Sequence, residues 1–286
     1  MYYLLATSVE ASGGELSVNI LDNQLEAYYA YSDAAVKPYG LVDPNGTFYN
    51  AQNAGIIESP RGYRYGLYLD DTDNRRDPRI GYRFQYEIWG QPSSRAGNSE
   101  YYQEDYNLTG YIPVIAENKG VLVLNQFFGS STVLKKGTVD QSLYICDDIA
   151  KPGCQAILNE LYARQVAEAD NGKATSLGGT NRLRGYLTNR FYDSYTNFRG
   201  VEFRWYVHEA QNAFNYILEK GTFAGLQLAF FYEEGTVSPD KGSLWKNMRS
   251  SYGAGTRFLF NTIIVRIDRG YGKEGGQTTF FVGYPF

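Results

Sequence analysis

The sequence has no long uninterrupted apolar stretch, and this lack limits the kinds of membrane protein it can form. Hydrophobic residues make up 43% of its 286 residues, but polar residues interrupt them throughout. A membrane-spanning helix needs about 18 or more consecutive apolar residues, so no such helix is expected. The first residues also lack a basic segment and a long apolar core, so they are not a signal peptide.

Residue types that commonly carry catalysis or bind metals are scarce. The only histidine, His208, has no flanking Ser motif of the kind that an outer-membrane phospholipase would need. Two Cys without clustered His give no zinc site. We therefore expect no enzyme activity, no metal and no cofactor. The net charge is only −4, so a nucleic-acid partner is not expected either.

Cysteine is nearly absent, and its two copies lie close together in the sequence. Cys146 and Cys154 flank a Lys-Pro-Gly turn, which suits a small disulfide loop. A disulfide would indicate an oxidising compartment. A pair of unpaired buried thiols is the alternative.

The chain is rich in aromatic residues and glycine instead. It contains 27 Tyr, 16 Phe and 31 Gly, and its mean hydropathy is −0.42. Such a composition is typical of an all-β protein, and it suits a transmembrane antiparallel β-barrel, whose strands alternate apolar and polar residues. A soluble β-sandwich or barrel is the alternative.

Apolar and polar residues alternate with a period of two, most clearly in residues 63–70, 82–89 and 201–207. One face of these runs is large and apolar, and the other carries charge of both signs, as expected for a lipid-facing wall and a polar lumen. We predict a single barrel domain over residues 1–286 with twelve strands, of which the first and last pair to close it. The predicted strands are residues 2–10, 15–21, 24–32, 63–70, 82–89, 101–114, 121–128, 200–208, 223–233, 250–260, 262–269 and 277–284.

Short and long connections alternate between most of these strands, which is typical of periplasmic turns and extracellular loops. The connections 11–14 and 209–222 fit this alternation less well, and the second predicts a brief helix. The longest connection, residues 129–199, is expected to be an extracellular loop. It contains a predicted helix at 153–169, where apolar residues recur at helical spacing.

Several motifs along residues 63–286 resemble, in their order and spacing, the carboxy-terminal barrel of the Omp-eighty-five superfamily, the BamA-, TamA- and FhaC-like proteins of the bacterial surface antigen type. The clearest is Gly178-Gly179 followed by Leu183-Arg184-Gly185-Tyr186, which is similar to the tip of the family's long sixth loop with Leu in place of Val. The other segments that carry the resemblance are residues 70–81, 100–114, 230–237, 252–257, 263–268 and the final Phe286.

The resemblance implies that the loop tip folds into the barrel lumen, where Arg184 meets an acid on a later strand. Strand phase independently places Glu233 on the lumen face of residues 223–233, although the family usually has Asp there. A buried guanidinium cannot lose its charge and needs a carboxylate partner. Other predicted lumen charges are Arg83, Glu87, Glu202, Arg204, Arg257, Arg266 and Asp268.

The last residues suggest a second function. Phe280, Val282, Tyr284 and Phe286 alternate on one face of the final predicted strand. This pattern resembles the signal by which the barrel-assembly machinery recognises outer-membrane proteins, so that machinery is an expected partner during biogenesis. A plain lipid-facing strand is the alternative.

The sequence predicts a non-enzymatic barrel of the bacterial outer membrane that assists protein or lipid insertion or translocation, with membrane lipids as partners. Compared with the family, it has fewer predicted strands than the usual sixteen and no residues for the periplasmic POTRA domains, so we expect either a short form that lacks POTRA domains or a part of a longer chain. The alternatives are a membrane anchor or translocator for a soluble domain that is missing here, and a passive pore. A homodimer that protects the barrel seam is a further hypothesis.

Overall fold

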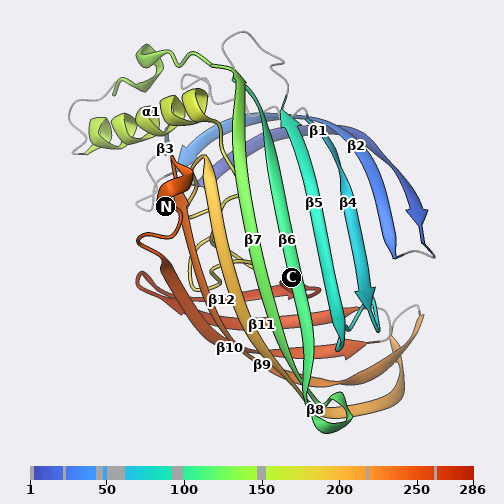
Figure 1. The fold of residues 1–286 in the computed structure, drawn as a ribbon. Helices are drawn as coiled ribbons and strands as arrows, with labels where there is room; N and C mark the ends of the chain where they lie inside the picture. Colours follow the sequence, from blue (N-terminus) through green and yellow to red (C-terminus); the bar gives the residue numbers. More distant parts are fainter. Residues whose placement is uncertain are drawn as a thin grey trace.

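The computed structural model describes residues 3–21, 24–42, 48–49, 62–91, 99–146, 153–216, 219–260 and 263–286. Most of them belong to β-strands, and α1 (Cys154–Asn171) is the α-helix among them (Figure 1). None of the described helices is both long and apolar enough to span a membrane. The strands are β1 (Tyr3–Ile20), β2 (Leu25–Val42), β3 (Phe48–Tyr49), β4 (Gly62–Thr72), β5 (Gly81–Gln91), β6 (Glu100–Ile115), β7 (Gly120–Lys135), β8 (Tyr195–Tyr216), β9 (Glu219–Ser238), β10 (Arg249–Phe260), β11 (Ile264–Gly272) and β12 (Gly275–Val282).

Each long strand pairs antiparallel with the next one along the chain, in the order β1-β2-β4-β5-β6-β7-β8-β9-β10-β11-β12, and β3 pairs only with β2. The sheet curls around, so that β4–β7 form the near wall in Figure 1 while β10–β12 pass behind. This confirms the predicted all-β antiparallel architecture. We call the end that carries α1 the loop end and the opposite end, with η1 (Ala116–Asn118), the turn end.

The predicted alternation of faces is confirmed in β8. Glu202 and Arg204 are fully buried inside the curled sheet, whereas Val201, Trp205 and Val207 are between 42% and 46% exposed on its outer side. Because successive side chains of a strand point to opposite faces, a sheet wrapped around polar side chains necessarily presents the apolar set outward.

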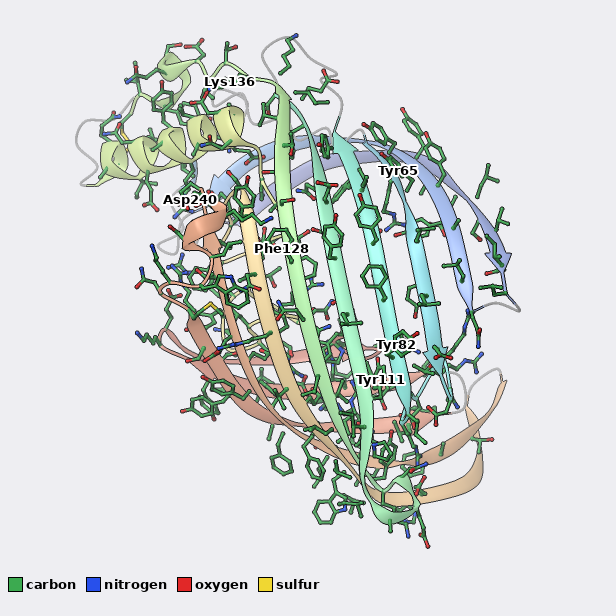
Figure 2. All side chains as sticks on the ribbon, viewed as in Figure 1. Tyr65, Tyr82, Tyr111, Phe128, Lys136 and Asp240 are labelled. Atoms are coloured by element: carbon green, nitrogen blue, oxygen red, sulfur yellow. A yellow bond between two sulfur atoms is a disulfide. The ribbon has the colours of Figure 1, made fainter. Side chains whose placement is uncertain are left out.

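Aromatic side chains make up much of the outer wall. Tyr65 and Tyr82 are 42% and 43% exposed, and in Figure 2 they lie with Phe128 on the wall formed by β4–β7. Side chains of this kind suit contact with lipid and with its polar boundary.

The amino-terminal part differs from the prediction of two strands at residues 2–10 and 15–21. Both belong to β1, and Gly13 and Gly14 pair in register with Ser32 and Tyr31 of β2 instead of forming a turn. Glycine is permissive rather than turn-forming, so it also tolerates an extended strand. The predicted strand 24–32 likewise continues to Val42 as part of β2. The twelve predicted strands thus correspond to eleven long strands, and the two-residue β3 is the twelfth.

The prediction of a connection with a brief helix at residues 209–222 is also wrong. β8 runs on to Tyr216 and β9 starts at Glu219, so the two strands form one long hairpin. Two register shifts, between Tyr206 and His208 and between Glu209 and Asn212, interrupt the alternation that would have marked a strand.

The predicted closure of the barrel is not observed among the described residues. β1 pairs with β2 and β12 pairs with β11, but no pairing joins β1 to β12. Since every neighbouring pair on the eleven-strand path is antiparallel, β1 and β12 run in the same direction, from the loop end to the turn end. With eleven strands on this path, β1 therefore begins at the loop end and β12 ends at the turn end.

The connection between β7 and β8 is shorter than predicted, because β7 extends to Lys135 and β8 begins at Tyr195. α1 lies in it at the loop end, close to the predicted helix. Gly153 and Gly172 bound the helix with φ of 82° and 71°, which are left-handed values that favour glycine. A disulfide joins Cys146 to Cys154 at its start, with a Cα–Cα distance of 6.1 Å.

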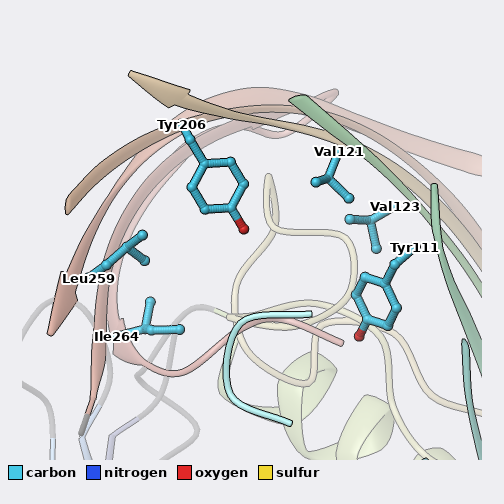
Figure 3. Packing of buried hydrophobic residues seen from close by; sticks show 6 residues of the cluster. All are labelled: Tyr111, Val121, Val123, Tyr206, Leu259 and Ile264. Carbon is cyan, nitrogen blue, oxygen red and sulfur yellow. The ribbon is translucent and has the colours of Figure 1, made fainter. Parts of the chain in front are cut away.

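The lumen near the turn end is packed rather than open. Tyr111, Val121, Val123, Tyr206, Leu259 and Ile264 project inward from five strands and form a buried cluster (Figure 3). The side chains of Tyr284 and Phe286 pack against this cluster. The hydrophobic core of the protein is thus inside the curled sheet.

Replacing both Cys146 and Cys154 by Ser should loosen α1 without unfolding the barrel. Closing a loop of this size is worth roughly 2–3 kcal/mol of chain entropy, but Cys154 is the only buried residue of α1, so the loss should stay local. Limited proteolysis should cut the helix faster, while heat denaturation of the barrel, followed by gel migration of unheated samples, should hardly change. A reductant should reproduce the effect in the parent protein and change nothing in the double variant. Collapse of the barrel in either case would contradict this.

Candidate functional site

The segment that follows α1 turns into the lumen as a compact hairpin-like loop. Leu177 and Phe191 exchange backbone hydrogen bonds across it, and the amide of Gly178 donates to the carbonyl of Arg182. Leu183 then adopts φ of 53°, a left-handed value that is unusual for a leucine. The side chain of Leu183 is fully buried in a cluster with Phe127, Leu177, Tyr186, Phe191 and Phe198. We call residues 177–191 the lumen loop.

Arg184, at the tip of the lumen loop, is held by three carboxylates from three different strands. Glu233 of β9 accepts from both the backbone amide and Nε of Arg184, each at 2.7 Å. Nη1 donates to Glu202 of β8 and to Asp268 of β11, each at 2.8 Å. All four side chains are fully buried. One side chain therefore ties the loop to β8, β9 and β11.

Two further contacts fix this arrangement. The hydroxyl of Ser251 donates to the Glu233 oxygen that also accepts from the Arg184 amide, at 2.7 Å. The guanidinium of Arg184 lies 3.6 Å from the ring centroid of Phe231, which gives it a cation–π contact inside the lumen. Both oxygens of the Glu233 carboxylate thus accept hydrogen bonds from buried donors.

The site continues into a larger buried network of charges. Arg257 donates to Asp268 at 2.6 Å and to Glu202 at 3.1 Å, and Arg204 donates to Glu202 at 2.8 Å. Arg266 donates to the carbonyl of Thr180 in the lumen loop at 2.9 Å. Four fully buried arginines, counting Arg184, meet three carboxylates, those of Glu202, Glu233 and Asp268.

The cations of the lumen loop keep their charge despite burial. Burial lowers the pKa of Arg184, but Glu233, Glu202 and Asp268 outweigh it and raise that pKa above its ordinary value. Burial lowers the pKa of Arg182 to about 10, which still leaves it charged at neutral pH. The guanidinium of Arg182 lies 3.7 Å from the ring centroid of Phe127.

Glycines let the loop tip approach β11 backbone to backbone. A Cβ on Gly185 would lie 2.5 Å from the carbonyl carbon of Tyr271, and a Cβ on Gly270 would lie 2.7 Å from the carbonyl carbon of Arg184. Tyr186 completes the contact, since its hydroxyl donates to the carbonyl of Ser250 at 3.2 Å and accepts from the amide of Lys273 at 3.2 Å. Gly185 and Gly270 are therefore required because the two backbones approach too closely to leave room for a Cβ.

The structure brings together most of the residues singled out from the sequence. Leu183, Arg184, Gly185 and Tyr186 lie at the loop tip, and Glu233 meets Arg184. Of the predicted lumen charges, Arg83 and Glu87 lie apart from this network. Arg83 pairs with Asp70 at 3.1 Å and Glu87 lies near Arg64 at 3.7 Å.

Sequence reasoning missed Ser251 and Arg182. Ser251 faces the lumen on β10, opposite Glu233 in register, and strand phase alone would have placed it there. Nothing in the local pattern around Arg182 distinguishes it from an exposed loop residue.

The predicted continuation of one aromatic face to the end of the chain is wrong. β12 ends at Val282, and Gly283 with φ of 106° redirects the following residues. Phe280 and Val282 are 67% and 51% exposed, whereas Tyr284 and Phe286 enter the lumen. An alternating pattern cannot reveal this bend, because glycine is equally compatible with a straight strand. We call residues 283–286 the tail segment.

Charged and aromatic groups hold the tail segment inside. Arg204 lies 3.7 Å from the ring centroid of Tyr284. At the turn end, Asp77 accepts from the hydroxyls of Tyr206 at 2.6 Å and Tyr284 at 2.5 Å. Phe286 packs against Phe198, with ring centroids 6.3 Å apart.

Chemically, this site is suited to hold segments in place. Among the described residues, no group of His, Cys, Asp and Glu is arranged to hold a metal ion. His208 lies exposed beyond the register shift of β8. Buried ion pairs instead join the lumen loop to the wall strands, and loss of one partner would leave an unpaired charge. The tail segment is joined to the wall by a cation–π contact and hydrogen bonds.

Glu233→Ala should destabilise the barrel strongly. It leaves the backbone amide and Nε of Arg184 and the Ser251 hydroxyl without their acceptor, and breaking a buried pair costs about 3–5 kcal/mol. Urea unfolding in detergent, followed by gel migration, would measure the loss, and the double variant with Arg184→Met should recover part of it. Glu274→Ala is the matched control, because its ion pair with Arg190 joins the same loop to the β11–β12 turn but is 40–44% exposed. Equal effects of the two single variants would contradict the assignment.

Gly270→Ala should displace the loop tip, because the added Cβ collides with the backbone of Arg184. Overpacking of this kind costs about 1–3 kcal/mol, and trypsin should cleave the loosened loop faster. Gly14→Ala on β1 is the control, since a Cβ there meets nothing within 4 Å. A lumen loop that stays protected from trypsin in the Gly270 variant would contradict the role of this glycine in the close approach.

One comparison with known proteins, that with solved structures, bears on the fold. By sequence, no protein family and no curated protein matches the chain. By structure, it is similar to the crystal structure of BamA from Haemophilus ducreyi lacking POTRA domains 1–3, with a TM-score of 0.55 and 13% sequence identity. The match covers 96% of this chain and 53% of the other, so the chain spans about half the length of that crystallised chain. The chain has a BamA-like β-barrel fold.

Proposed function

We propose that this chain is a non-enzymatic barrel of the bacterial outer membrane that assists the insertion or translocation of other molecules there, with β-strand polypeptides as its main cargo and lipids as the second candidate. The observation that carries the proposal is the direction of its two free strand edges. β1 and β12 each have one unpaired edge among the described residues, and both run from the loop end to the turn end.

Free edges are costly in a membrane. The hydrocarbon layer offers no water to satisfy exposed backbone groups, and each unsatisfied group costs several kcal/mol, so open sheet edges do not persist there. Direct closure of β1 on β12 would need a parallel pair in a sheet that is antiparallel everywhere else. One strand of the opposite direction would pair antiparallel with both edges, which favours a barrel that accepts a strand from another polypeptide.

The filled lumen argues against a passive pore. The lumen loop is held by buried ion pairs, and the tail segment occupies the turn end. Together with the buried cluster around Tyr111 they occupy much of the interior next to β6–β11 that an aqueous channel would need. This favours work at the seam over passage through the lumen.

Two adjacent prolines on β12 test the proposal. Successive backbone amides of a strand point to opposite edges, so Thr278→Pro and Thr279→Pro remove donors from different edges. The measurement is the rate at which a separate unfolded outer-membrane barrel folds into vesicles that contain the purified chain. The parent chain should accelerate folding of this client relative to empty vesicles. The variant whose proline removes a donor from the unpaired edge of β12 should lower that acceleration by about five-fold or more while the chain itself stays folded. The other proline serves as the control, because it should lower stability through the β11 pairing.

Each alternative has its own outcome. No acceleration over empty vesicles would refute assistance with protein insertion, and movement of labelled lipid between leaflets in the same vesicles would then support the lipid candidate. Large steady channels in planar bilayers would favour the passive pore. Crosslinking across β12 that captures a second copy would identify a homodimer as the source of the missing strand, and the barrel-assembly machinery can be tested as a partner in the same way.

A further inference from the structure

A groove crosses the outer wall of the barrel, on the side away from the lumen loop. Its volume is about 850 Å³, and it spans five neighbouring strands from β5 to β9. Tyr82, Leu108, Leu124, Val201 and Tyr232 give it a mainly apolar lining, and each of them is 40–48% exposed.

The groove follows two adjacent rows of cross-strand neighbours. In the first row Tyr82 pairs with Gly110, Gly110 with Leu124, Leu124 with Val201, and Val201 with Tyr232. The second row lies two register positions nearer the loop end, on the same face, and runs from Leu108 through Gln126 and Arg199 to Glu234. A row of paired residues runs across the strands, and barrel strands tilt by about 35–45°, so the groove crosses the hydrocarbon layer obliquely.

A glycine forms the floor of the groove. Gly110 lies in the outward phase of β6, and a Cβ built on it would meet nothing within 4 Å. Its neighbours in the row, Tyr82 and Leu124, stand on either side of it. The missing side chain therefore leaves a notch between larger residues.

The two ends of the groove differ in polarity and in height. Tyr82 is the second residue of β5, at the turn end, whereas Glu234 lies near the loop end of β9. Four strand spacings separate these two ends, which makes the groove about 19 Å long. This is comparable with the depth of one leaflet, about half of the 30 Å hydrocarbon core.

An ion pair occupies the loop-end side. Nε of Arg199 donates to Glu234 at 2.7 Å, and Nη2 donates to the same oxygen. The hydroxyl of Tyr232 donates to the other oxygen of Glu234 at 2.7 Å. The side chain of Arg199 is 55% exposed and that of Glu234 is 21% exposed. Charges on the lipid-facing side of a barrel are destabilising except near the interfaces, so they need a reason.

The geometry points to a binding site for one zwitterionic phospholipid, with its phosphate on Arg199, its ammonium on Glu234 and an acyl chain along the notch over Gly110. The charges are complementary because Arg199 and Glu234 offer one cation and one anion side by side, like a phosphoethanolamine headgroup in reverse. An anionic lipid would satisfy Arg199 but bring its charge against Glu234. This site rests on the barrel lying in a membrane and not on the seam activity proposed above.

Native mass spectrometry of the purified chain tests the site. After delipidation, the chain is incubated with phosphatidylethanolamine or phosphatidylglycerol in detergent and then washed. One phosphatidylethanolamine per chain should be retained, in about ten-fold preference over phosphatidylglycerol, which corresponds to about 1.4 kcal/mol. Equal retention of the two lipids, or retention of detergent alone, would overturn the proposal.

Variants separate the groove from the lipid that surrounds any barrel. Gly110→Leu fills the notch and should abolish retention. Ala254→Leu, which places the same final side chain at an exposed outward position on β10, should leave retention unchanged. Arg199→Gln should weaken the retention of both lipids. Glu234→Gln should remove the preference for phosphatidylethanolamine. Gel migration of unheated samples checks that each variant is folded. Unchanged retention in Gly110→Leu, or a preference for lipid A over phosphatidylethanolamine, would refute the assignment.

Retention of lipid by the folded chain does not depend on cargo insertion. A chain that binds phosphatidylethanolamine but does not accelerate folding of a client would leave this site standing and remove the seam activity. A chain that accelerates folding of a client but does not retain phosphatidylethanolamine would remove this site and leave the seam activity standing.

Discussion

The architecture depends on one charge that cannot be neutralised. The guanidinium of Arg184 stays protonated in any protein environment, so its place inside the lumen requires carboxylates in fixed positions. Glu202, Glu233 and Asp268 supply them from β8, β9 and β11, with distances of 2.7–2.8 Å. The strands must therefore keep a curvature that brings these three together, and the lumen loop must keep its backbone close enough to β11 for the contact through Gly270. The curvature of the sheet and the position of the buried ion pairs therefore constrain each other.

Much of this could be predicted from alternation and strand phase. A period of two separates Glu202 and Arg204 from Val201 and Trp205, and the same rule places Glu233 in the lumen. The failures occur where glycine or a bulge breaks the rule. Gly13-Gly14 reads as a turn but continues a strand, and the register shifts after Tyr206 hide the extension of β8. The inward course of the tail segment follows from Gly283, whose left-handed φ no local pattern announces.

The curled sheet divides its tasks between faces and edges. Its interior is closed by ion pairs and aromatic packing, and its outer wall carries an oblique groove that ends at Arg199 and Glu234. Within the part of the chain that the structure describes, its two edge strands each leave one edge unpaired and run in the same direction. A wall made rigid from within can present such edges without collapsing, because the strands behind them are braced at the lumen loop. The buried network ties β8, β9 and β11 to the lumen loop, so the strands behind the β12 edge are braced from within.

The course of the tail segment also sets an order of events in time. In the folded barrel, the hydroxyl of Tyr284 is bound to Asp77 and the ring of Phe286 lies against Phe198. Neither side chain can then be offered to a receptor outside the barrel. Any machinery that reads these aromatic residues has to do so while the chain is still unfolded, and completion of the lumen withdraws them. Recognition of these residues would then end in the same folding step that completes the barrel.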